Sequence, residues 1–115
     1  MKTEKNMTND QIVFTLILHA GNSKSDSMEA LKAAREGNFV LSEEKQRSAE
    51  QELTAAHQIQ STMLADFANG EEFPVDILMV HAQDHLNDAI TTLDLTKEMV
   101  MMYQKIRNME GKKGE

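Results

Sequence analysis

The segment from Val75 to Met109 limits the possible folds most strongly, because its apolar residues recur with helical spacing along its whole length. At about 100° per residue, one inward face consists of Met79, Ala82, Leu86, Ala89, Leu93, Thr96 and Val100. A second face beside it consists of Ile77, His81, Asp84, Asp88, Leu95, Met99, Met102 and Ile106, with His85 and Tyr103 between the two. Together the faces span about 200°, roughly twice the stripe that covers a single core. The segment therefore predicts a long helix that is buried on two sides.

Two further helical segments precede it. The first begins at a capping box formed by Thr8 and Gln11 and ends at Gly37 and Asn38, a typical helix-stop pair. Its predicted apolar stripe is Val13, Ile17, Ala20, Met28, Leu31 and Ala34. Residues 21–27, "GNSKSDS", contain side chains that favour turns over helix interiors. They predict a kink within this helix.

The second helical segment is predicted to begin near Ser42, where Glu43 and Glu44 suit the positive end of the helix dipole. It ends in residues 69–74, "NGEEFP", which contain a Gly and a Pro. Its inward residues are Ala49, Leu53, Ala56, Met63 and Phe67, and Gln60 falls in the same stripe. The chain is thus predicted to be all-α, with an antiparallel three-helix bundle as one domain over residues 8–109. A disordered tail at residues 1–7 and a C-terminal tail at 110–115 are predicted to flank it.

The second face of the last helix predicts self-association. Three antiparallel helices bury only one side of each helix, so a helix with two apolar faces needs another partner. A closed homo-oligomer is the economical solution. The alternative is that Met99, Met102 and Ile106 form an ordinary exposed patch or bind a different protein.

Composition excludes several classes of function. A net charge of -7 and 4% aromatic residues oppose nucleic-acid binding. The absence of Cys excludes disulfides, thiolate metal sites and cysteine nucleophiles, and favours a reducing compartment. The longest apolar run, "IVFTLIL", is too short to span a bilayer. We therefore expect a cytoplasmic protein that does not insert directly into the membrane.

The stretch "VHAQDHL", residues 80–86, gathers chemically active side chains on one side of the last helix. His81, Asp84 and His85 could be ligands of a metal, or they could lie on a solvated face. If copies of Asp84 met on an oligomer axis, carboxylates about 4 Å apart would repel by ~4 kcal/mol per pair at an effective dielectric near 20. A hard cation such as Mg²⁺ would offset that repulsion. His81 would then be free to act as a nucleophile, and a neutral imidazole suits phosphoryl transfer.

"VHAQDHL" resembles the signature of the lactose/cellobiose-type enzyme IIA family of the bacterial sugar phosphotransferase system. The likeness extends through "AGNSKSDSMEALKAAREGNF" in the first helix and "AHQIQSTML" in the second. The resemblance implies a three-helix subunit that assembles as a parallel homotrimer. It also implies a histidine that accepts phosphate from the general phosphocarrier protein HPr. That histidine passes the phosphate to a cysteine on the cognate IIB protein or domain, for uptake of a lactose/cellobiose/chitobiose-type sugar.

The signature transfers onto this chain residue by residue. His81 matches the phosphorylated histidine, and Asp84 matches the residue whose three copies surround Mg²⁺ or a similar divalent cation on the trimer axis. Gln83 and His85 match supporting positions. His57 and Gln60 match positions in the second helix and are predicted to have a supporting role near the phosphorylated imidazole; the alternative is a polar contact within the bundle. Asn87 stands where many members have Met, on the outer, polar side of the helix beyond the two faces, so the departure bears on partner fit more than on chemistry.

Two rival functions remain open from the sequence. One is a metal-binding helical bundle with His81, Asp84 and His85 as ligands, and the other is a helical interaction module without transfer chemistry. The signature leans toward the cellobiose/chitobiose branch over the lactose branch. Sugar selectivity, however, belongs to the membrane permease.

Overall fold

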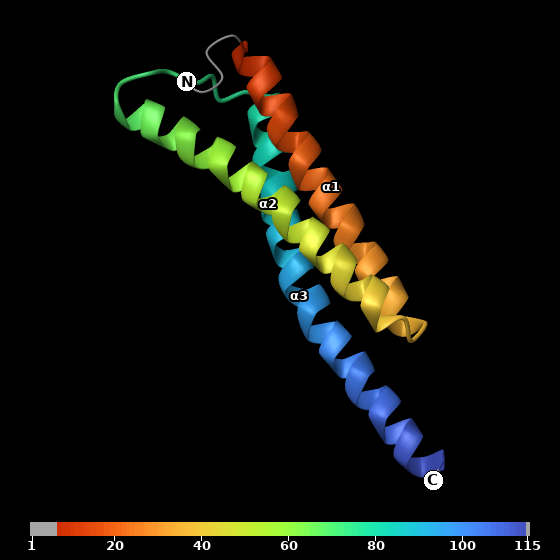
Figure 1. Cartoon of the computed structure of the whole chain (residues 1–115). Helices are drawn as coiled ribbons and strands as arrows, with labels where there is room; N and C mark the ends of the chain where they lie inside the picture. Colours follow the sequence, from red (N-terminus) through yellow and green to blue (C-terminus); the bar gives the residue numbers. More distant parts are fainter. Residues whose placement is uncertain (1–6, 115) are drawn as a thin grey trace.

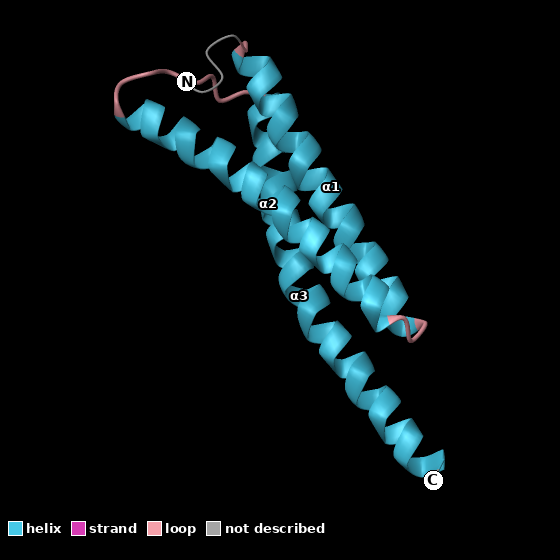
Figure 2. Ribbon diagram, in the orientation of Figure 1, coloured by secondary structure: helices cyan, strands magenta, loops and turns pink. Residues whose placement is uncertain are grey.

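Three long helices make up almost all of the protein. The computed structural model describes residues 7–114, and within them the elements are α1 (Asn9–Arg35), α2 (Phe39–Ala68) and α3 (Ile77–Gly114). α1 and α3 run in the same direction and α2 runs antiparallel to both (Figure 1). The described chain outside the helices is loop (Figure 2). The predicted all-α three-helix subunit is therefore confirmed.

The two predicted tails compare differently with the structure. Apart from Met7, the N-terminal tail predicted at residues 1–7 lies outside the described residues. The last helix was predicted to end at Met109, but α3 continues through Gly114 and takes in most of the predicted C-terminal tail. At its other end α3 begins at Ile77, two residues after the predicted Val75.

The helix ends follow from local chemistry. The Thr8 hydroxyl accepts a bond from the Gln11 amide nitrogen at 3.1 Å and the Gln11 side chain accepts one from the Thr8 nitrogen at 2.9 Å, which confirms the capping box. α1 ends at Arg35, and Gly37 follows with a φ of 85°, which suits glycine. The guanidinium of Arg107 occupies the space that a Cβ at residue 37 would need. α2 begins at Phe39, three positions before the predicted Ser42, because the Asn38 side chain accepts a bond from the Leu41 nitrogen at 3.1 Å.

α1 and α2 pack closely along a line of small side chains. Ser23 and Ser27 lie fully buried on α1, and the Ser23 hydroxyl donates to the carbonyl oxygen of Ala49 on α2 at 2.9 Å. α1 passes through residues 21–27 without a break (Figure 1). The predicted kink was therefore wrong, because the residues that favour turns are held here by tertiary packing.

The buried core confirms most of the predicted apolar stripes. Its largest cluster consists of Ile12, Val13, Leu16, Ala56, Ile59, Met63, Ala82 and Leu86. Two predicted core residues are instead exposed, Met28 and Phe67. Met28 lies about 100° away from the buried Ser27 on the helix surface, so it falls beside the stripe. Phe67 lies near the C-terminal end of α2, which diverges from the other two helices (Figure 1).

The two faces of α3 have opposite environments in the protomer. Ala82, Leu86, Ala89, Leu93, Thr96 and Val100 are buried and Met79 is partly buried, as predicted. The second face, by contrast, is exposed along its whole length. It is polar from His81 to Asp88 and apolar from Leu95 to Ile106. Over the described residues, no helix has a stretch long and apolar enough to cross a membrane.

Ser27→Ala is expected to raise the free energy of unfolding by about 1 kcal/mol, because the buried Ser27 hydroxyl has no hydrogen-bond partner among the described residues. Ser23→Ala is the matched control, since it removes a hydroxyl that is equally buried but bonded, and it is expected to lower the free energy by about 1 kcal/mol. Denaturant titration followed by circular dichroism, at one protein concentration, measures both. Equal losses in the two variants would contradict the assignment of Ser27 as unsatisfied.

Candidate functional site

His81 and His85 form a contacting pair near the start of α3. Their Nε2 atoms are 3.1 Å apart, and the rings meet edge to face with centroids separated by 4.4 Å. The spacing of four residues places both rings on one side of the helix. A hydrogen bond between two imidazole nitrogens needs a proton on one of them and a lone pair on the other. The His81 ring is exposed and the His85 ring is half-buried, so a reactant in solution can reach His81.

Asp84 lies beside this pair without a partner of its own. It is exposed and makes no hydrogen bond or ion pair with any residue in the described range 7–114. It borders a shallow hollow that is also lined by Val75, Asp76, Ile77, Val80 and His81. A carboxylate in such a position keeps all its oxygen lone pairs available for a ligand.

Gln60 and Gln83 form a reciprocal amide pair between α2 and α3. Each side-chain nitrogen donates to the oxygen of the other at 2.9 Å, and the Gln83 nitrogen also lies 3.7 Å from the Met79 sulfur. Both side chains are half-buried. The structure thus brings these two predicted site residues to each other, and over residues 7–114 neither is bonded to His81 or His85. Their contact holds α3 against α2 at the level of the histidine pair, because Gln83 lies between His81 and His85 and about half a turn from each.

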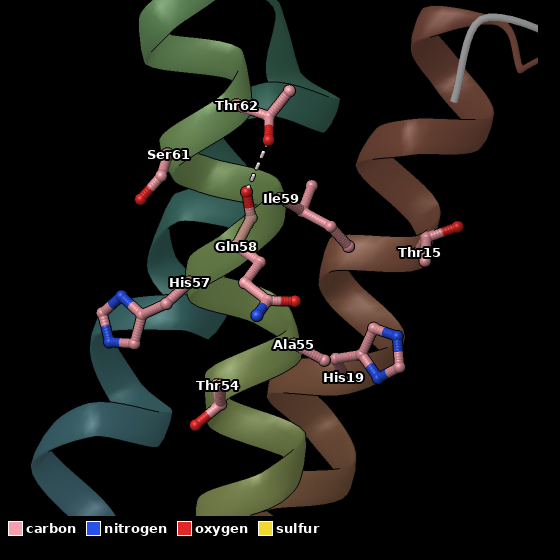
Figure 3. Close-up of a pocket in the computed structure, with 9 residues that line it drawn as sticks. All are labelled: Thr15, His19, Thr54, Ala55, His57, Gln58, Ile59, Ser61 and Thr62. Carbon is pink, nitrogen blue, oxygen red and sulfur yellow. Dashed lines mark hydrogen bonds between the residues drawn. The ribbon is translucent and has the colours of Figure 1, made fainter. Parts of the chain in front are cut away.

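His57 is exposed on α2 and is not bonded to any other histidine of the described chain. It lines a groove between α1 and α2 together with His19, and the two rings point away from one another (Figure 3). The Nδ1 atom of His19 is 2.6 Å from the Oε2 atom of Glu52, an interaction between α1 and α2. His57 makes no hydrogen bond within the described part of the chain. Helical periodicity does not predict the contact between His19 and Glu52, because the two residues are 33 positions apart.

The rival interpretation of a metal site within one subunit finds no support in the geometry. Within residues 7–114, no three His, Asp or Glu side chains of the protomer converge closely enough to hold a metal ion. His81, Asp84 and His85 are therefore not a ready three-ligand site. A cation near Asp84 would need donors from outside this chain.

The structure places the protein in the class of small all-α three-helix subunits, with an exposed histidine, His81, near the start of the third helix. Residues 11–104 match the family model of the PTS system, Lactose/Cellobiose specific IIA subunit. The chain belongs to this family. It is a IIA phosphotransferase component of the bacterial sugar phosphotransferase system, a phosphocarrier for lactose/cellobiose/chitobiose-type sugars. The resemblance noted in the sequence is confirmed, and the rival of a helical module without transfer chemistry is set aside.

Individual relatives support the same assignment. The chain is 41% identical to the lichenan-specific phosphotransferase enzyme IIA component of Bacillus subtilis, over 89% of this chain and 93% of the relative. The crystal structure of the cellobiose-specific enzyme IIA from Bacillus anthracis superposes with a TM-score of 0.86 at 37% identity, over 89% of this chain and 94% of that one. The IIA subunit in the IIA(Chitobiose)–HPr complex of Escherichia coli gives a TM-score of 0.75 at 25% identity, over 88% and 98% of the two chains.

Proposed function

We propose that His81 is the residue that carries the phosphoryl group. Among the residues of the signature it combines an exposed ring with a neighbouring hydrogen-bonding group, His85, at 3.1 Å. A lone pair on an imidazole nitrogen attacks the phosphorus of the donor, and the bond from phosphorus to the donor nitrogen breaks. In the second step a cysteine thiolate of the acceptor attacks the same phosphorus, and the bond to His81 breaks. The imidazole of His81 leaves with its lone pair. In the first step no proton has to be removed, because the attacking nitrogen of a neutral imidazole carries a lone pair and no proton.

His85 is proposed to hold the ring of His81 in place. The contact between the two Nε2 atoms restricts rotation of an otherwise exposed side chain. A fixed ring orientation favours in-line attack on phosphorus, for which positioning matters more than acid–base assistance. The two hydrogen bonds between Gln83 and Gln60 hold α2 against α3, the helix that carries both histidines.

The donor is proposed to be phospho-HPr and the acceptor a cysteine of the cognate IIB protein or domain. A chitobiose-type relative that is 25% identical has been solved as a complex with HPr. Relatives bear names that include lichenan, cellobiose, oligo-beta-mannoside and lactose. We propose that this chain serves uptake of a sugar of the same type, most nearly of the cellobiose/chitobiose branch, and that it acts in the cytoplasm.

The active form is proposed to be a parallel homotrimer joined through the second face of α3. Leu95, Met99, Met102 and Ile106 expose apolar surface on one side of a helix that the protomer leaves uncovered. Complete burial of a fully exposed side chain of this kind contributes roughly 1.5–3 kcal/mol, and these four are about half exposed in the protomer, so each would contribute roughly half of that. A threefold contact of identical helices covers the face of all three copies at once.

Asp84 is proposed to bind a shared divalent cation such as Mg²⁺ on the threefold axis. The donor set fits a hard cation, because each subunit offers an unpartnered carboxylate and within residues 7–114 no other donors of the protomer converge on it. The cation would neutralise the like charges of the three Asp84 carboxylates. His81 and His85 then remain free for chemistry.

Removing divalent cations with EDTA is expected to weaken association of the native chain, since the copies of Asp84 would repel one another. Asp84→Asn removes this charge, so its association is expected to be unchanged by EDTA. Sedimentation velocity over a range of protein concentrations, with and without Mg²⁺, measures both. An equal response of the two proteins to EDTA would contradict a cation at Asp84.

The transfer assay tests the function itself. Incubation with enzyme I, HPr and labelled phosphoenolpyruvate is expected to place one acid-labile phosphate on each subunit, and addition of the IIB protein is expected to remove it. Peptide mapping under alkaline conditions identifies the labelled histidine. Label on a histidine other than His81 would overturn the assignment.

A further inference from the structure

An ion pair joins α1 to the second face of α3. The Nζ atom of Lys24 lies 2.6 Å from the Oδ2 atom of Asp88, across 64 positions of sequence. The two side chains are 47% and 49% exposed, so the pair sits at the edge of the surface that the proposed trimer would cover. By itself, an exposed pair of this kind adds little to the stability of a protomer.

Asp88 follows Asp84 by one helical turn on the same face. Four residues correspond to a rise of about 6 Å and a rotation of about 40°. The two acids have different surroundings, because Asp88 is paired with Lys24 whereas Asp84 has no partner within the described residues. In a closed trimer each acid would occur three times near the axis. Without Lys24, two successive rings of carboxylates would repel one another, and interactions shielded from water are screened little by salt.

We propose that Lys24 is a positioning residue of the subunit interface. It neutralises Asp88 from within its own subunit, and Asp84 remains the uncompensated acid of the second face. The shared cation is thereby directed to Asp84, one turn away from Asp88 and adjacent to His81. This inference rests on the trimer of the proposed function, and it assigns a role to a residue outside the signature.

Lys24→Met tests the charge of Lys24 while keeping most of its apolar stem. The concentration at which half the trimer dissociates, measured by sedimentation equilibrium with Mg²⁺ present, is expected to rise about tenfold, which for three subunits corresponds to about a hundredfold in the dissociation constant, or about 2.8 kcal/mol per trimer. Lys24→Arg is expected to retain native association. Lys24→Met combined with Asp88→Asn is expected to restore it, because both charges are then absent. A purely structural role of the lysine stem would not be rescued by a change at Asp88.

Lys97→Met is the matched control. Lys97 on α3 pairs with Glu50 on α2, the two side chains are 43% and 50% exposed, and neither residue belongs to the second face. The trimer of Lys97→Met is expected to dissociate at the same concentration as the trimer of the native chain. Circular dichroism checks that each variant is folded. Asp88→Asn alone provides a further test and is expected to associate as the native chain does.

The outcomes separate this inference from the proposed function. A native chain that sediments as a monomer with Mg²⁺ present would remove the trimer and the role of Lys24 with it. A native trimer in which Lys24→Met and Lys97→Met dissociate equally would overturn only the role of Lys24. Loss of association on Asp88→Asn alone would also overturn it, because the pair would then act as a tie between helices.

Discussion

His81→Ala is expected to abolish phosphorylation by phospho-HPr, with incorporation reduced at least a hundredfold, because the variant lacks the nitrogen that attacks phosphorus. The side chain is exposed and lies outside the buried core, so the helical content and the state of association are expected to match those of the native chain. Labelling with phosphoenolpyruvate, enzyme I and HPr measures the loss. Circular dichroism and sedimentation show that the subunit is otherwise intact.

His57→Ala is the control for this experiment. His57 is also an exposed histidine, but it lies on α2 and has no hydrogen bond within the described chain. It is expected to retain at least half of the native labelling rate. Native labelling of the His81 variant would rule out His81 as the acceptor and would direct attention to His85, the ring it contacts.

Met102→Asp is expected to dissociate the proposed trimer at micromolar concentrations. Met102 is 60% exposed in the protomer and lies in the apolar half of the second face, where each of three subunits would bury an uncompensated carboxylate. The cost of burying such groups is several kcal/mol per ion even after relaxation. Sedimentation velocity is expected to show a protomer of native helical content.

Met101→Asp provides the neighbouring control. Met101 is 56% exposed on the same helix, but it is turned about 100° from Met102 and lines a hollow between α2 and α3. It is expected to leave association unchanged. Dissociation of both variants, or of neither, would contradict an interface on the second face.

Much of the fold could be predicted because it follows from local periodicity. The spacing of Leu86, Leu93 and Val100 identified the buried face of α3, and the pairing of Thr8 with Gln11 located the start of α1. The errors arose where a neighbouring element decides the outcome. Phe67 has the spacing of a core residue, yet α2 diverges from the bundle where it lies. The residues that predicted a kink in α1 remain helical because α2 packs against them.

The contacts of the site that join neighbouring residues of one helix could be predicted from the sequence. His81 and His85 are four residues apart on one helix, so their contact follows from helical geometry. The pairing of Gln60 with Gln83, 23 positions away, and of Lys24 with Asp88 depends on how the helices pack. The pattern of a single sequence contains no signal for such pairs. The roles of His57 and of Asp84 depend on the arrangement of subunits and stay predictions.

The second face of α3 has a polar half and an apolar half, and the two halves contribute different things to the protein. Residues from Leu95 to Ile106 supply apolar area, while those from His81 to Asp88 supply reactive and charged groups. Substitutions at His81 or His85 therefore leave the apolar area of the proposed subunit contact unchanged.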